Sequence, residues 1–291
     1  MQIRYAMPAL VLGLLAFPVL SSQDSTTDRY RFEIETAAVI DLSEMGRGER
    51  ETTTHVAGEM SVTFAEDGGI NIVLDTMTGT EEGEPLTPSV LAEMIGTTWT
   101  AVLDDKGRLS DLQSSRPASQ SRGPPGPRTV QQHILTPLFP YIAPGASVGD
   151  MWSDTLAFKG SSYRMNYDTE VDPVTGVVDS VLVDSVFTRS GEITTHIEYT
   201  AVADTTYLGV AALVVETTST TTTTGYMERQ REGGMDIEGT ATGTGLLYIG
   251  SDGKYLGGVR QLEWQFEMTG RQNQMVIPVK RSSKYMIELL P

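Results

Sequence analysis

The sequence predicts an all-β-dominated protein: a large curved antiparallel meander, or half-barrel, that wraps a few short helices. Three observations lead to this prediction. Much of the chain alternates apolar and polar residues, as strands with one buried face do. Several alternating runs are much longer than the roughly five or six residues of an ordinary strand. The chain is also rich in Thr, Val, Ile, Tyr and Gly, which favour strands and turns.

Residues 1–22 have the pattern of a secretory signal peptide. Arg4 supplies a positive charge, and the apolar run over residues 9–19 is too short to span a bilayer comfortably. We expect this segment to be removed and the mature protein to reach the periplasm or the extracellular space. Peripheral association with the outer membrane and an uncleaved anchor are the alternatives. Later segments are not apolar enough to cross a membrane, so we expect the mature form not to be transmembrane.

The composition limits the partners and the source of stability. The chain has 38 acidic and 21 basic residues and a net charge of −17. Such a surface repels nucleic acid and anionic lipid, so both are poor partners, and we expect no nucleic-acid partner. There is no Cys, so an exported form without disulfides depends on burial of a hydrophobic core. The composition does not define the oligomeric state.

The mature chain opens with strands predicted to form a meander. In the first strand, Tyr30, Phe32 and Ile34 share one face, and charged residues occupy the other. Short polar turns separate the runs, which favours antiparallel pairing of neighbours. The three strands are predicted at residues 29–41, 52–64 and 70–80.

A short amphipathic helix is predicted next, over residues 88–95. Thr87 suits the cap and Pro88 the first helical position, while Gly96 ends the segment. Its apolar stripe consists of Val90, Leu91, Met94 and Ile95.

The segment between the two halves of the chain is rich in Pro and Gly. Residues 113–129 are interpreted as an exposed loop or linker, and residues 130–135 as a short helix. Pro137, Pro140 and Pro144 then predict an extended or turning path. We expect one curved β domain over residues 23–291. An alternative is two similar halves, residues 23–112 and 130–291, joined by this loop.

From residue 151 to the end, long strands are predicted almost without interruption. The Thr tract at residues 217–224 admits a flexible stalk, but Thr is β-branched and favours continuation of the preceding strand. Gly239, Gly243 and Gly245 mark places where the sheet bends.

One hairpin pattern occurs twice. Residues 97–112 and 244–261 each have an apolar run, a charged turn with one glycine, a basic residue and a second apolar run. Gly107 aligns with Gly253, and Arg108 with Lys254. Two similar halves would explain the repeat, but such turns also recur in any meander.

No motif predicts catalysis, a cofactor or a metal site. The run Ser251 to Lys254 matches the letters S-x-x-K, but its Asp-Gly pair predicts a hairpin rather than the helix this motif needs. Residues 241–247 lack the third glycine of a dinucleotide loop. The three histidines lack metal-ligand spacing and are interpreted as ordinary residues; they are His55, His133 and His196.

One acidic cluster admits two interpretations. Asp168, Glu170 and Asp172 alternate along one strand, where a solvated acidic face is favoured over a calcium site. Paired carboxylates of a hydrolase remain a lesser alternative.

The aromatic and apolar residues near turns and in the connector are the candidate ligand contacts. Core packing is the default interpretation of such side chains. A wide curved sheet, however, has a concave face that a helix or a ligand must fill. The candidate ligand-binding residues are Leu91, Met94, Trp99, Phe139, Trp152 and Trp264.

The stretch "PGASVGDMWSDTL" at residues 144–156 resembles uncharacterised secreted members of the LolA/LolB/LppX-like bacterial envelope proteins. The signal segment and the long-stranded meander are similar as a pattern. The resemblance implies a half-barrel over helices, with an apolar cavity for acyl chains or a lipidated partner. The chain departs from the LolB and LppX pattern because it lacks the lipoprotein cysteine.

We therefore expect a non-enzymatic envelope protein that binds a hydrophobic small molecule or a lipidated protein. A structural or interaction module with a filled core is the alternative from another class. A cavity search distinguishes the two, because only a carrier needs an unfilled interior.

Overall fold

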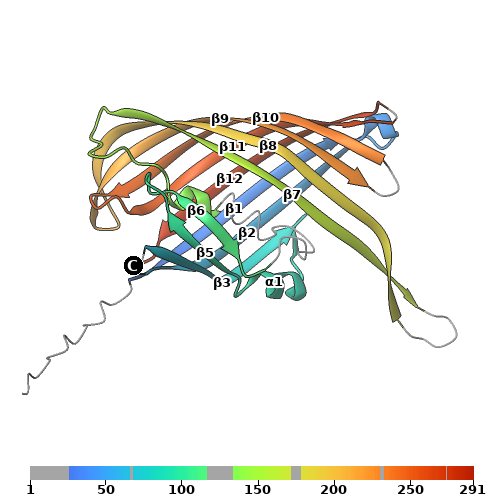
Figure 1. Ribbon diagram of the computed structural model, residues 1–291, viewed down its shortest axis with the longest axis horizontal. Helices are drawn as coiled ribbons and strands as arrows, with labels where there is room; N and C mark the ends of the chain where they lie inside the picture. Colours follow the sequence, from blue (N-terminus) through green and yellow to red (C-terminus); the bar gives the residue numbers. More distant parts are fainter. Residues whose placement is uncertain (1–25, 66–67, 117–133, 172–177, 230–232, 273) are drawn as a thin grey trace, which may run out of the picture.

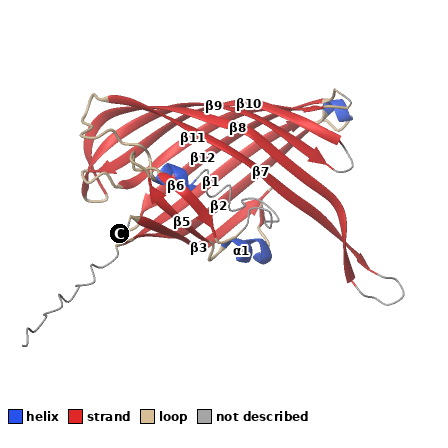
Figure 2. Ribbon diagram, in the orientation of Figure 1, coloured by secondary structure: helices blue, strands red, loops and turns tan. Residues whose placement is uncertain are grey.

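The computed structural model describes residues 26–65, 68–116, 134–171, 178–229, 233–272 and 274–291. Most of them belong to a single antiparallel sheet of 12 strands (Figures 1 and 2). The fold-class prediction is confirmed. The strands are β1 Thr27–Asp41, β2 Glu49–Phe64, β3 Gly69–Glu81, β4 Glu84–Pro85, β5 Thr98–Leu103, β6 Leu109–Ser114, β7 Met151–Val171, β8 Val178–Tyr207, β9 Val210–Arg229, β10 Gly233–Gly250, β11 Tyr255–Gly270 and β12 Val276–Leu289.

The sheet follows the order of the chain but opens between β6 and β7 rather than at the termini. Its order is β6-β5-β3-β2-β1-β12-β11-β10-β9-β8-β7, and the short β4 pairs with β3. The first and last strands are neighbours, with Phe32 opposite Ile287. The sheet is strongly curved in Figure 1. The connector from β6 to β7 therefore leaves one edge of the sheet and returns at the other.

Alternation divides the strands into an inner, apolar face and an outer, polar face. In β1, Tyr30, Phe32 and Ile34 are buried, as predicted. The Thr tract continues β9, with Thr217 and Thr221 buried and the intervening Thr218 exposed. Thr suits both faces because it is β-branched and also polar.

Three helical segments lie between strands in the part of the chain that the structure describes. They are η1 Ser43–Met45, α1 Pro88–Met94 and α3 Thr136–Leu138. The helix predicted at residues 88–95 is confirmed as α1, and Met94 is buried. Ile95, however, is 37% exposed and lies outside the helix, because Gly96 turns the chain with a φ of 77°. No helix in the described ranges is both long and apolar enough to cross a membrane.

The connector supplies part of the core. Ile134, Leu135 and Leu138 are buried in the same hydrophobic cluster as the inner faces of the strands. Pro137 lies in the first turn of α3, where its missing N–H has no helical partner to lose. Of the extended or turning path expected at Pro137, the chain takes a turn. Residues 117–133, which include most of the predicted loop and His133, lie outside the described residues.

The two similar hairpins form the same turn. In the first, the Asp104 N–H donates to the Arg108 carbonyl at 2.8 Å, and Gly107 has a φ of 75°. In the second, the Gly250 N–H donates to the Lys254 carbonyl at 2.7 Å, and Gly253 has a φ of 82°. The first hairpin joins β5 to the edge strand β6, and the second joins the interior strands β10 and β11.

Candidate ligand cavity

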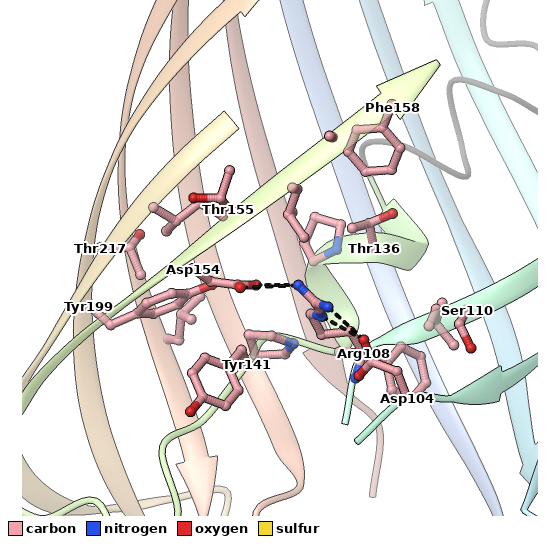
Figure 3. Close-up of a pocket in the computed structure, with 18 of the residues that line it drawn as sticks. Asp104, Arg108, Ser110, Thr136, Tyr141, Asp154, Thr155, Phe158, Tyr199 and Thr217 are labelled. Carbon is pink, nitrogen blue, oxygen red and sulfur yellow. Dashed lines mark hydrogen bonds and ion pairs between the residues drawn. The ribbon is translucent and has the colours of Figure 1, made fainter. Parts of the chain in front are cut away.

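A two-lobed cavity lies between the connector and the inner faces of strands β7–β12. The first lobe has a volume of about 350 Å³ and the second about 250 Å³. Pockets that hold small organic ligands start at roughly 300 Å³. Thr136, Leu156, Phe158 and Arg260 line both lobes, so the two are adjacent. Figure 3 shows the first lobe, with Thr136 and Phe158 on one side of it and Tyr199 on another.

The walls of the cavity are mainly apolar and come from distant parts of the chain. Phe139 in the connector and Ile197 and Leu247 on neighbouring strands line the first lobe. Trp264 and Phe266 line the second. A surface of this kind favours an apolar guest because burial removes that guest's surface from water.

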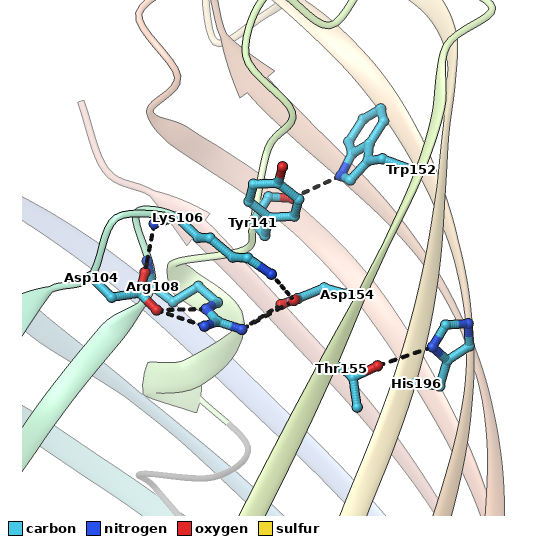
Figure 4. Close-up of polar contacts among 8 residues, drawn as sticks. All are labelled: Asp104, Lys106, Arg108, Tyr141, Trp152, Asp154, Thr155 and His196. Atoms are coloured by element: carbon cyan, nitrogen blue, oxygen red, sulfur yellow. Dashed lines mark hydrogen bonds and ion pairs between the residues drawn. The ribbon is translucent and has the colours of Figure 1, made fainter.

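A charged cluster stands at the rim of the first lobe. Arg108, in the first hairpin, donates from Nη1 to both carboxylate oxygens of Asp154 on β7 at 3.0 and 3.1 Å (Figure 4). Lys106 Nζ donates to the same carboxylate at 3.3 Å. The Asp154 side chain is only 2% exposed. A carboxylate so buried needs such cations, because an unpaired buried charge is costly.

Asp104 completes this cluster from the start of the hairpin turn. Its carboxylate accepts hydrogen bonds from Arg108 Nε at 2.8 Å and from two backbone N–H groups of the turn. Burial opposes ionisation of Asp104, but these hydrogen bonds outweigh it and lower the pKa of its carboxyl. The hydrogen bond to Asp104 and the contact with Asp154 raise the pKa of Arg108. Asp104 and Arg108 are therefore ionised at neutral pH.

An aromatic wall continues the rim. Trp152 stacks on Tyr199, with ring centroids 5.4 Å apart and planes 4° apart. The indole Nε1 of Trp152 donates to the Tyr141 carbonyl at 2.9 Å, which fixes the connector against β7. Burial, with Asp154 nearby, raises the pKa of Tyr199, so its hydroxyl stays neutral.

A second arginine, Arg260, lies on the inner face of β11. It faces Gly245 on β10 in the sheet register, and Gly245 in turn faces Thr217 on β9. Arg260 reaches over β10 to Ser219 on β9, where its Nη2 lies 3.4 Å from the hydroxyl oxygen. Burial lowers the pKa of Arg260. An arginine nevertheless stays protonated in proteins.

Two glycines of β10 leave room for side chains of the neighbouring strands. A Cβ at Gly243 would lie closest to Leu262 Cδ2 and 2.5 Å from the Ser219 hydroxyl, and one at Gly245 would lie 2.6 Å from the Thr217 hydroxyl. These distances are shorter than real contacts allow. The glycines predicted to bend the sheet thus also admit inner side chains of β9 and β11.

The six candidate ligand residues fall into two groups. Phe139 and Trp264 line the cavity, and Trp152 packs behind its rim against Tyr199. Trp99 and Met94 are buried in the hydrophobic core with exposures of 1% and 2%, and Leu91 packs against that core. The structure therefore brings three of the six to the cavity region and places the other three in the core beside α1.

The remaining candidate residues are distributed over strands and turns. His55 lies 2.6 Å from a Glu33 oxygen, and His196 Nδ1 lies 3.2 Å from the Thr155 hydroxyl. Asp168 and Glu170 belong to β7, and Asp172 lies outside the described residues. Ser251 to Lys254 form the predicted hairpin turn.

Sequence reasoning missed Arg108, Asp154 and Arg260. A usable signal existed for Arg260, which alternates in phase with Leu262, Trp264 and Phe266. A cation on the apolar face of an alternating strand is unusual, because charged residues are rarely buried unless paired. The Arg108–Asp154 pair gave no local signal, because the two residues belong to different elements.

Comparison with known proteins assigns no family. No family model and no curated protein matches the chain. Similar solved structures include a triple mutant of Rhodopseudomonas blastica porin, 9% identical, covering 90% of this chain and 100% of the porin, with a TM-score of 0.27. Another is OccK9 (OpdG) of Pseudomonas aeruginosa, 8% identical, covering 91% and 98%, with a TM-score of 0.27. A third is the outer membrane protease OmpT of Escherichia coli, 8% identical, covering 90% and 94%, with a TM-score of 0.26. At these TM-scores the likenesses support no conclusion about function.

Proposed function

We propose that this protein is a non-catalytic carrier in the bacterial envelope that holds a hydrophobic small molecule, or the acyl chain of a lipidated partner, inside its curved sheet. The observation that carries the proposal is the two-lobed cavity between the connector and the inner sheet face. A packed interaction module would need no such space, because protein interiors are otherwise filled close to crystal density.

The lining supports an apolar guest over a polar one. Leu156 and Phe158 on β7 and Trp264 on β11 face the cavity, so a guest could lose most of its apolar surface to them. The outer face has the opposite character, since Glu216, Thr218 and Thr220 on β9 are exposed. Export to the envelope, suggested by residues 1–22, and the function implied by the LolA/LolB/LppX resemblance belong to the same proposal.

The test uses residues 23–291, purified and extracted with organic solvent. Mass spectrometry of the extract should find a co-purified lipid, and the delipidated protein should bind the neutral fluorescent probe Nile red. Replacing Leu156 with Trp should fill the junction of the lobes and abolish probe binding. The matched control is Thr220→Trp on the exposed face of β9, which should bind as before.

Repeated absence of lipid, together with no uptake of Nile red, would overturn the carrier proposal. Equal probe binding by both Trp variants would also contradict it, because it would place the probe outside the cavity.

A further inference from the structure

The cavity contains a positive charge without a matching carboxylate. Among the described residues, no Asp or Glu lies within ion-pair distance of Arg260, whose one side-chain hydrogen bond is the 3.4 Å contact with the Ser219 hydroxyl. A guanidinium has five N–H donors. One long hydrogen bond leaves most of them available to a guest.

The other cation of the first lobe provides the contrast. Arg108 also lines that lobe, but Asp104 and Asp154 neutralise it at 2.7 and 3.0 Å. Arg108, which we interpret as a structural arginine, is thus paired with two carboxylates. Around Arg260 the described residues provide hydroxyl groups: it contacts Ser219, and Tyr199 and Tyr285 are close enough to affect its pKa.

The position of Arg260 suits an anchor for one end of a guest. It lines both lobes, so a group bound to it would lie at their junction. Arg281 on β12 lines the second lobe but not the first, and it lies opposite Trp264 in the sheet register. Its Nε donates to the Ser283 hydroxyl at 3.2 Å. The interior thus carries cations in a chain whose net charge is −17. The acidic outer surface repels an anion, so an anionic guest is expected to bind inside the cavity.

We propose that the guest is a long-chain fatty acid whose carboxylate is bound by Arg260 and whose acyl chain lies along the apolar lobes. This inference rests on the proposed carrier function and specifies its ligand. A planar guanidinium matches a carboxylate through two parallel hydrogen bonds, which are strong in a site shielded from water. A neutral guest would instead leave the Arg260 charge uncompensated.

The experiment is displacement of Nile red from delipidated residues 23–291 by palmitate and by its methyl ester. The ester keeps the chain and removes the charge. Palmitate should bind roughly 10- to 100-fold more tightly, as expected for hydrogen bonds to a charged group. Arg260→Met should abolish that preference while methyl palmitate binds as before, and Arg260→Lys should restore part of it.

Two control variants make the assignment specific. Arg50→Met removes an exposed arginine that pairs with Glu82 at 3.2 Å, and it should leave the preference unchanged. Arg281→Met removes the other lobe cation, and loss of the preference in this variant alone would overturn the assignment to Arg260. If Arg260→Met does not fold, the comparison of palmitate with its ester on the unaltered protein still decides whether the cavity prefers a fatty acid to its neutral ester.

The outcomes separate the two proposals. Equal binding of palmitate and its ester overturns the fatty-acid inference and leaves the carrier function standing. Failure of Nile red and of both compounds to bind overturns the carrier function itself. Displacement by phosphatidylglycerol but not by palmitate overturns the fatty-acid assignment in favour of a phospholipid.

Discussion

Arg108 and Asp154 join two edges of the sheet that are not paired by backbone hydrogen bonds. Arg108 precedes β6 and Asp154 belongs to β7, and these strands are the two ends of the strand order. The shortest contact between their side chains is 3.0 Å. Because both residues also line the first lobe, one ion pair both bridges the open side of the sheet and borders the cavity.

Removing the charge of Asp154 should therefore destabilise the fold. In Asp154→Asn, Arg108 and Lys106 lose the carboxylate that both contact, and we expect the free energy of unfolding to fall by about 1.5–3 kcal/mol. Asp104 still pairs with Arg108, which limits the loss. Denaturant unfolding measures it. The control is Asp236→Asn, which breaks the exposed pair with Arg271 and should change stability much less. Equal losses would mean that the Arg108–Asp154 pair between the two sheet edges contributes no more to stability than an exposed pair.

The two hairpin turns should respond alike to the same substitution. Gly107 and Gly253 have φ values of 75° and 82°, and a Cβ at either would meet no atom within 4 Å. The cost of Gly→Ala is thus purely conformational, about 1–2 kcal/mol at each site. Asn tolerates this conformation better, so Gly→Asn should cost less. Thermal unfolding of the four variants checks this, and a large loss at one turn only would show that the turns are not equivalent.

Much of the fold could be predicted because local patterns encode it. The alternation of Tyr30, Phe32 and Ile34 defines a strand and its buried face, and the Thr87–Pro88 start and Gly96 stop define α1. The strand order follows mostly from short turns between neighbours. The pairing of β1 with β12 and the opening between β6 and β7 could not be predicted, because they depend on contacts between strands far apart in the chain.

The candidate site was less predictable for the same reason. Aromatic residues drew attention by their type, yet type alone does not separate Trp99 in the core from Trp264 at the cavity. That distinction depends on which strands face the hollow. Gly243 and Gly245 could be recognised as unusual in a strand, but which side chains they make room for depends on the register of three strands.

Buried tyrosines should make the fold sensitive to alkali. Burial, with Glu288 nearby, raises the pKa of Tyr207 to about 12, against about 10 in an unfolded chain. Burial also raises the pKa of Tyr30, Tyr199 and Tyr255. Above pH 10 the unfolded chain loses these protons first, so the free energy of unfolding falls as pH rises from about 10 towards 12.

Denaturant unfolding at pH values on both sides of 10 measures this fall, with tyrosinate absorbance followed in parallel. Tyr207→Phe should make the decline shallower, because it removes one of the groups whose pKa differs between the states. Its hydrogen bond to Glu288 at 3.1 Å is also lost, so stability should be slightly lower at neutral pH. A decline of the same steepness in the variant would contradict the raised pKa.

Trp264 should report the ligand by fluorescence, whereas Trp99 should not. Both are tryptophans on the inner side of the sheet, but Trp264 lines the second lobe and Trp99 is 1% exposed within the core. An acyl chain in the second lobe displaces water beside the Trp264 indole, so its emission should shift to shorter wavelength. Palmitate should therefore shift the emission of the unaltered protein and of Trp99→Phe, but not that of Trp264→Phe. A shift that is lost in Trp99→Phe and kept in Trp264→Phe would place the ligand against the core beside α1, and the cavity between the connector and β7–β12 would then not be the binding site.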